Sequence, residues 1–102
     1  MKILFDQGTP APSRHELPGH EVATAFEMGW SNLSNGDLIR AAESAFNLLI
    51  TTDKNLQHQQ NLSRNQLSIL YLPTTSWPRL RGNLAQVQAA VDSIRTGELR
   101  DL

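Results

Sequence analysis

The apolar residues of this chain fall into four short runs separated by polar segments, a pattern typical of buried strands. The runs cover residues 2–5, 20–26, 47–52 and 67–72. The second run alternates only partly, whereas the third is the most apolar in the chain. We therefore predict four strands and expect the third run to lie at the centre of their sheet.

Helical signals lie between and after these runs. A short helix over residues 14–17 is expected to end at Pro18-Gly19, because proline cannot continue a helix. Apolar residues at helical spacing predict an amphipathic helix over about 36–46, with Ser34 as its N-cap. The same pattern predicts a last helix over residues 76–94.

Local signals bound this last helix, and two polar segments lack clear periodicity. Ser76 can cap the helix, Pro78 suits its first turn and Gly97 ends it. Residues 54–64 are rich in glutamine and asparagine and can form only a short helix or a loop. The tail, residues 98–102, either frays or adds a short edge strand.

The order of strands and helices predicts one α/β domain over residues 1–102. Alternation of strands with helices and short connections favours a three-layer α/β/α sandwich. Its sheet would be mainly parallel, with four to five strands. In such a sheet the carboxyl ends of the strands lie along one edge, where ligands bind.

Composition excludes several classes of protein. The 102 residues include no cysteine, so neither a disulfide framework nor a thiolate zinc site can form. The formal charge of −1 gives no basic field for long-range capture of nucleic acid. The opening MKILFDQ has too short an apolar run for a signal peptide or a membrane span. We therefore expect a cytoplasmic protein without a membrane segment.

Three acids are the candidate chemistry. Asp6 and Asp53 each follow a predicted strand, and Asp37 lies at the start of the middle helix. Gathered at one sheet edge, they would form a site for Mg²⁺ or Mn²⁺, and a phosphodiester is the natural substrate of such a site. Structural roles are open for each acid: Asp37 in a capping box with Ser34, Asp53 as an N-cap, and Asp6 in an Asx-turn.

Other side chains favour structural roles. The histidines His15, His20 and His58 lack the spacing of zinc ligands, so solvated surface positions are expected for them. Glycine-rich phosphate loops and a nucleophile elbow are absent from the sequence. Trp30 and Trp77 are predicted to be core or interface anchors rather than platforms for stacked bases.

Together, several segments resemble the small PIN-like proteins, relatives of the VapC ribonuclease toxins. They are FDQGTP (5–10), PGHEV (18–22), NGDLIRAA (35–42), LLITTDKN (48–55) and the fourth strand. The resemblance covers nearly the whole chain. It implies a Rossmann-like PIN fold, a ribonuclease dependent on Mg²⁺ or Mn²⁺, a cognate antitoxin and a homodimer.

The resemblance also assigns roles to residues. The acids that it implies as metal ligands and catalytic groups fall on Asp6, Asp37 and Asp53, with Thr52 in support. At two positions the chain departs from the family, since Gln7 replaces a glutamate and Asn55 an aspartate. Both can still offer neutral carbonyl oxygens.

Basic residues near the predicted edge are candidate contacts for phosphates. They are Lys54, Arg79 and Arg81, and a solvated helix turn is an equally good interpretation of the two arginines. Our first hypothesis is a toxin-type endoribonuclease. A catalytically degenerate PIN-like module that binds a protein or RNA is the alternative, and a nucleotide-binding or phosphatase-like enzyme is a third possibility.

Overall fold

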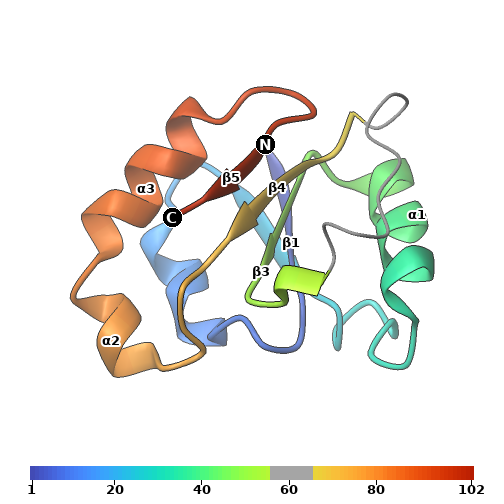
Figure 1. The fold of residues 1–102 in the computed structure, drawn as a ribbon, viewed down its shortest axis with the longest axis horizontal. Coiled ribbons are helices and arrows are strands. Elements are labelled where there is room, and N and C mark those ends of the chain that lie inside the picture. Colours follow the sequence, from blue (N-terminus) through green and yellow to red (C-terminus); the bar gives the residue numbers. More distant parts are fainter. Residues whose placement is uncertain (56–65) are drawn as a thin grey trace.

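A five-stranded parallel sheet forms the middle layer of the computed structural model, which describes residues 1–55 and 66–102 (Figure 1). The strands are β1 (Lys2–Phe5), β2 (Glu21–Thr24), β3 (Leu48–Thr51), β4 (Ser68–Tyr71) and β5 (Leu99–Asp101). Their spatial order is β2-β1-β3-β4-β5, and every neighbouring pair runs parallel. The predicted α/β fold, with its third run at the sheet centre, is confirmed.

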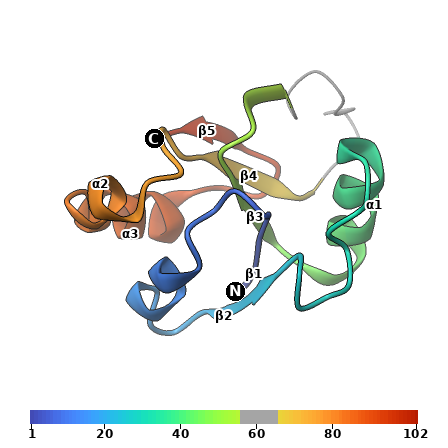
Figure 2. The same ribbon diagram turned by 90° about the horizontal axis from the view of Figure 1, so that it is seen from below.

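Helices cover both faces of this sheet. The 3₁₀ helix η1 (Ala11–Glu16), α2 (Trp77–Arg81) and α3 (Leu84–Ser93) lie on one face, and α1 (Asn35–Ala45) lies on the other. Figure 2 shows this arrangement, with the sheet between α1 and the pair α2 and α3. The architecture is therefore the three-layer sandwich that the element order predicts.

Alternating side chains of the strands build a separate core on each face. Ile3 and Phe5 of β1 pack toward η1, α2 and α3, whereas Leu4 packs toward α1. β3 divides in the same way, with Leu48 on the first face and Leu49 on the second. Both faces of the central strands are thus buried, which explains their continuous apolar runs.

The middle helix closely follows the prediction. It begins after Ser34, whose hydroxyl accepts a hydrogen bond of 3.2 Å from the amide of Asp37, as expected of an N-cap. Leu38, Ile39 and Ala42 form its buried stripe. This stripe fixes α1 against the sheet and places the start of the helix near the carboxyl ends of the strands (Figure 1).

The predicted last helix is wrong in one respect, because two helices occupy its range. Gly82 ends α2 and Asn83 is the N-cap residue of α3. Glycine is a poor residue in helix interiors and asparagine favours helix starts, so the pair interrupts the pattern. Ser76 precedes α2, but its side chain makes no capping hydrogen bond.

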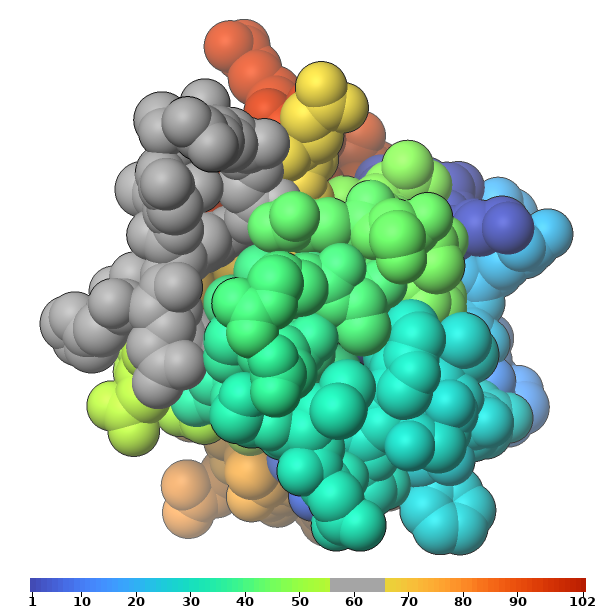
Figure 3. Space-filling model, turned by 90° about the vertical axis from the view of Figure 1, so that its right-hand side faces the viewer, coloured from blue at the N-terminus to red at the C-terminus, as the bar shows by residue number. Residues whose placement is uncertain are grey.

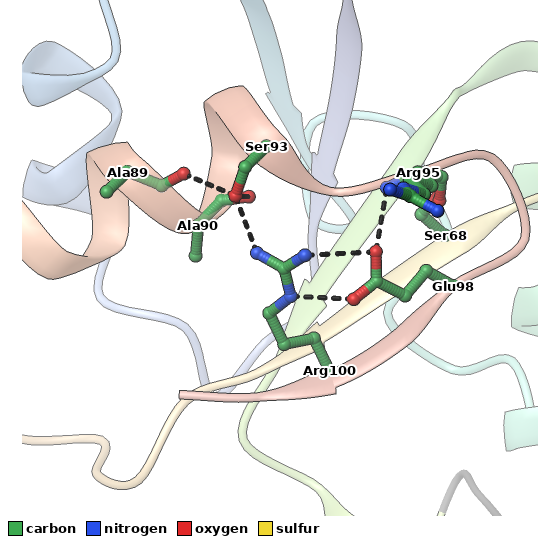
Figure 4. A network of polar contacts seen from close by, with 7 residues as sticks. All are labelled: Ser68, Ala89, Ala90, Ser93, Arg95, Glu98 and Arg100. Carbon is green, nitrogen blue, oxygen red and sulfur yellow. Dashed lines mark hydrogen bonds and ion pairs between the residues drawn. The ribbon is translucent and has the colours of Figure 1, made fainter.

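The predicted tail supplies the edge strand β5, which Arg100 ties to α3 (Figure 4). The Arg100 guanidinium donates to both carboxylate oxygens of Glu98, at 2.7 and 3.0 Å, and to the hydroxyl of Ser93 at 2.7 Å. Glu98 also accepts a hydrogen bond of 2.9 Å from the amide of Arg95. This network holds the turn between α3 and β5.

The polar segment and the histidines complete the comparison with the predicted elements. Residues 56–64 of the polar segment, including His58, lie outside the described residues. His20 is not freely solvated, since it bonds to the amino group of Met1 at 3.1 Å and to Asp92 at 3.2 Å.

Within residues 1–55 and 66–102, no helix has the length and apolar character needed to cross a membrane.

Candidate functional site

The candidate site lies at the point of the sheet where the chain switches from building on one side of β1 to building on the other. The chain passes from β1 outward to β2, and then crosses back to place β3 on the other side of β1. In open parallel sheets, ligands bind in the crevice beyond the carboxyl ends at such a switch point. Asp6 directly follows β1, Asp53 lies two residues after β3, and both line one hollow of about 240 Å³.

Strand alternation explains why this hollow opens toward α1. Leu4 and Leu49 both pack on the α1 face of the sheet. Asp6 and Thr51 lie two residues further along the chain in each case, so they continue on the same side. The opposite wall comes from α1 and the segment before it, which cover this side of the molecule (Figure 3).

Asp6 is held from both sides by hydroxyl groups. The hydroxyl of Thr51 donates to one carboxylate oxygen, and Thr9 Oγ1 donates to the other at 2.9 Å. The amide of Asp6 donates to the Ile50 carbonyl at 3.2 Å, which fixes the backbone at the strand end. Burial raises the pKa of Asp6, while the hydrogen bonds from Thr51 and Thr9 offset part of that shift.

Asp53 is oriented by three groups around it. Its amide donates to Thr51 Oγ1 at 3.0 Å, and its two carboxylate oxygens accept hydrogen bonds from the Asn35 side chain at 3.2 Å and the Asn55 amide at 2.9 Å. The bond to Asn55 is of the kind that an N-cap side chain makes, the structural role considered for this acid. The bond to Asn35 adds a link between the end of β3 and the first residue of α1.

Asp37 does not line the hollow. It is exposed, and its carboxylate forms an ion pair with Arg40 one turn further along α1. The hydrogen bond from Arg40 lowers the pKa of Asp37, and Ser34 and the charge of Arg40 act in the same direction. The structure thus brings together Asp6 and Asp53 and gives Asp37 a helix-start role. Across the described ranges, three or more His, Cys, Asp or Glu residues nowhere gather closely enough to share a metal ion.

Two of the predicted supporting residues lie in the hollow. Gln7 and Thr52 both line it. Gly8 follows Gln7 in the loop after β1. This loop passes so close to the end of β3 that a Cβ on Gly8 would lie 2.5 Å from Thr52 Oγ1. A Cβ here would displace the Thr52 side chain or the loop, so glycine is favoured by close approach rather than by backbone conformation. Asn55 is exposed and contributes its backbone amide to Asp53.

None of the predicted basic residues lines the hollow. Lys54 donates to Asp101 at 2.6 Å and lies 5.3 Å from the centre of the Tyr71 ring. Arg79 and Arg81 are exposed on α2, which packs on the opposite face of the sheet. Trp30 and Trp77 pack against the two cores, in accordance with the anchor role predicted for them.

Sequence reasoning missed four polar residues of this site: Thr9, Ser31, Asn35 and Thr51. Ser31 Oγ is buried in the wall of the hollow and has no hydrogen-bond partner among the described residues. A signal existed for Thr51, a hydroxyl inside an apolar strand two residues before an acid. Nothing in the sequence singles out Ser31, whose position depends on the path of the segment before α1.

The donor set of the hollow suits a hard divalent cation that keeps much of its water. Mg²⁺ is commonly held by one or two carboxylates together with water and substrate phosphates. Asp6 and Asp53 supply two carboxylates. An ionised carboxylate can accept about four hydrogen bonds. Asp6 already accepts bonds from the Thr51 and Thr9 hydroxyls and from the backbone of Gly8 and Thr9, whereas Asp53 accepts two, so the spare acceptor capacity lies on Asp53. The hydroxyl of Ser31, which lacks a partner in the described part of the chain, adds a polar group that a ligand can satisfy.

No protein-family model, curated protein or solved structure matches this chain. The PIN-like resemblance therefore rests on its sequence motifs.

Proposed function

We propose that this protein is a metal-dependent endoribonuclease of the PIN-like toxin type, which hydrolyses RNA phosphodiester bonds in the cytoplasm. One observation carries the proposal: Asp6 and Asp53 line a single hollow at the switch point between β1 and β3. This is the position at which open parallel sheets bind ligands. The acids are also two of the three to which the resemblance gives catalytic roles.

Asp6 and Asp53 would hold Mg²⁺ or Mn²⁺ in this enzyme. When bound, such an ion polarises a phosphoryl oxygen and lowers the pKa of a water ligand. Thr51 and Thr9 fix the orientation of the Asp6 carboxylate, and Asn35 fixes that of Asp53. Because Thr51 belongs to β3 and Asn35 begins α1, these two partners would set the carboxylates before substrate arrives.

Neutral polar groups of the hollow would position the substrate. Ser31 Oγ has no hydrogen-bond partner within residues 1–55 and 66–102, and the Gln7 side chain can donate or accept. With a net charge of −1 the protein lacks long-range attraction for RNA, so phosphate contacts must be local. Arg79 and Arg81 are exposed on α2, on the other face of the sheet from the hollow, so they would reach only phosphates remote from the scissile bond.

A second function has its own supporting observation. Asp37 is paired with Arg40 outside the hollow, and neutral Gln7 and Asn55 stand where the family has acids. A site with two carboxylates binds a cation more weakly than a site with four or five. This favours the alternative of a catalytically degenerate module that binds RNA or a protein partner. A cognate antitoxin and a homodimer are part of either proposal.

Cleavage of a mixed pool of RNA separates the two functions. Wild type, Asp53→Asn and Asp37→Asn are incubated with the RNA in Mn²⁺ and in a metal chelator. The nuclease proposal predicts Mn²⁺-dependent fragments with wild type and Asp37→Asn, and at least a hundredfold less cleavage with Asp53→Asn. RNA binding by wild type without fragments at millimolar Mn²⁺ would instead support the binding module.

A further inference from the structure

Phe26 is an aromatic side chain that the fold leaves in solvent. It is 80% exposed, whereas the other aromatic rings within residues 1–55 and 66–102 are buried or half-buried. The ring therefore adds nothing to either hydrophobic core. A single exposed apolar residue needs no explanation by itself. The position of Phe26 beside the candidate site is what makes its exposure informative.

Phe26 lies at the rim of the hollow that the acids line. The parallel register pairs Phe5 with Thr24, and the amide of Ala25 donates to the Phe5 carbonyl at 2.8 Å. Ala25 therefore lies beside Asp6, since adjacent strands are about 4.8 Å apart. Ala25 itself lines the hollow, and Phe26 is the next residue along the chain.

Backbone hydrogen bonds fix the turn that carries Phe26. The Phe26 carbonyl accepts the amide of Gly29 at 3.1 Å, and the Ala25 carbonyl accepts the amide of Trp30 at 2.8 Å. Gly29 has a φ of 76°, which glycine adopts without strain. The ring thus stands on an ordered support, so a ligand that contacts it does not have to order the turn on binding.

We propose that Phe26 is a stacking platform for an unpaired base of an RNA strand bound at the hollow. This inference rests on the RNA-directed function proposed above and adds to it a residue that holds a base. Aromatic side chains stack on the bases of single strands with little regard to sequence, because every base has a π-face. A strand with a phosphate in the hollow crosses the rim, where Phe26 receives an adjoining base.

The surroundings of Phe26 favour a single base over an apolar protein surface. The adjacent Glu27 is paired with Arg14 at 2.8 Å, which compensates its repulsion of phosphates. Met28 is 39% exposed but lines a separate hollow between β2 and the end of α1. Leu33 is 38% exposed and lines the candidate site. Protein interfaces are organised around clusters of anchors in packed pockets, whereas these three apolar side chains are divided between two hollows and a rim.

The test measures the affinity of single-stranded RNA for variants at position 26. The probe is a short labelled RNA with phosphorodithioate linkages, which resist hydrolysis, so fluorescence anisotropy can give its dissociation constant in Mn²⁺. Phe26→Ala removes the ring, Phe26→Leu keeps an apolar side chain without a ring, and Phe26→Trp restores a ring. Met28→Ala is the control, an exposed apolar position away from the candidate site. Circular dichroism establishes that each variant is folded.

We expect Phe26→Ala and Phe26→Leu to bind the probe at least fivefold more weakly than wild type, and Phe26→Trp and Met28→Ala to remain within twofold. Annealing the probe to its complement should abolish the difference between wild type and Phe26→Ala, because paired bases are not free to stack on the ring.

The outcomes separate this inference from the proposed function. If wild type binds the probe and Phe26→Leu binds equally well, stacking is wrong. If Phe26→Ala also keeps the affinity of wild type, the ring has no part in RNA binding and is left as a protein contact. If wild type does not bind the probe, the proposed function fails and the stacking role fails with it. Should Phe26→Ala be unfolded, Phe26→Leu and Phe26→Trp decide by the same criteria.

Discussion

The hydroxyl of Thr51 donates a hydrogen bond to the carboxylate of Asp6, so that the end of β3 orients the acid at the end of β1. The same hydroxyl accepts the amide of Asp53 at 3.0 Å. One buried side chain therefore sets the positions of both acids that line the hollow. A threonine in the middle of an apolar sheet is thereby explained by the site rather than by the core.

Replacing Thr51 by valine should lower the stability of the protein, and it should also remove the hydroxyl that positions Asp6 and Asp53. Valine keeps the shape but leaves a carboxylate and an amide without their hydroxyl partner, at a cost of about 1–3 kcal/mol in the free energy of unfolding. Urea unfolding measures this loss. Thr51→Ser, which retains the hydroxyl, should recover more than half of it, and equal stability of the valine and serine variants would contradict the bridging role.

Asp6→Asn should leave the protein as stable as wild type, or more stable by on the order of 1 kcal/mol, at neutral pH. Burial raises the pKa of Asp6, so the folded state binds a proton more readily than the unfolded state. Ionisation of Asp6 at neutral pH therefore costs stability, and protonation at acidic pH relieves that cost.

The stability difference between Asp6→Asn and wild type should accordingly be largest near neutral pH. It should shrink as the pH falls through the raised pKa of Asp6. Urea unfolding at a series of pH values checks the sign. A difference that grows on acidification would show that the hydrogen bonds of Asp6, rather than its burial, dominate the pKa.

Gly8→Ala should disturb the hollow, because the added Cβ would lie 2.5 Å from Thr52 Oγ1. Such overpacking typically costs about 1–3 kcal/mol. Gly82→Ala is the matched control, since its Cβ would meet the nearest atom at an ordinary 3.5 Å. Thermal unfolding should give a lower melting temperature for Gly8→Ala than for Gly82→Ala, and equal values would place the loop after β1 further from β3.

Tyr71→Phe should raise the free energy of unfolding by about 1–3 kcal/mol. The Tyr71 hydroxyl is buried without a hydrogen-bond partner in the described part of the chain, so phenylalanine removes an unsatisfied polar group. Chemical unfolding of the two proteins at pH 7 measures the gain. A loss of stability would show that the hydroxyl has a partner.

The raised pKa of Tyr71 leads us to expect that the free energy of unfolding depends on pH in the alkaline range. Burial, with the negative charges of Asp101 and Asp53, raises the pKa of Tyr71 to about 12. The unfolded chain releases this proton near pH 10, so the stability contributed by neutral Tyr71 is complete below pH 10 and declines as the pH rises toward 12. Tyr71→Phe should lack this component of the decline.

β1, β3 and β4 were predictable because both of their faces are buried. A run such as residues 47–52 is continuously apolar because both faces of its strand are covered. Such a run can be recognised from the sequence alone. The break at Gly82-Asn83 was not found because the apolar spacing of Leu80, Val87 and Val91 continues across it. Each helix presents its own stripe to the same core, so periodicity cannot separate one helix from two.

The site was predictable only where it follows from strand ends. Asp6 and Asp53 could be placed together because parallel strands align their carboxyl ends. Asp37 could not be placed, since the choice between the hollow and Arg40 depends on the rotation of α1 about its axis. The ion pair of Arg14 with Glu27 escaped prediction for a similar reason, because these residues meet only when η1 lies beside β2.

The most direct test of the account is calorimetric titration of Mn²⁺ into wild type, Asp6→Asn, Asp53→Asn and Asp37→Asn. The account predicts binding to wild type, loss of the binding heat in the first two variants, and an affinity within about threefold of wild type in Asp37→Asn. No binding to wild type at millimolar Mn²⁺, or unchanged binding in Asp6→Asn and Asp53→Asn, would contradict the claim that these two acids hold a cation at the switch point.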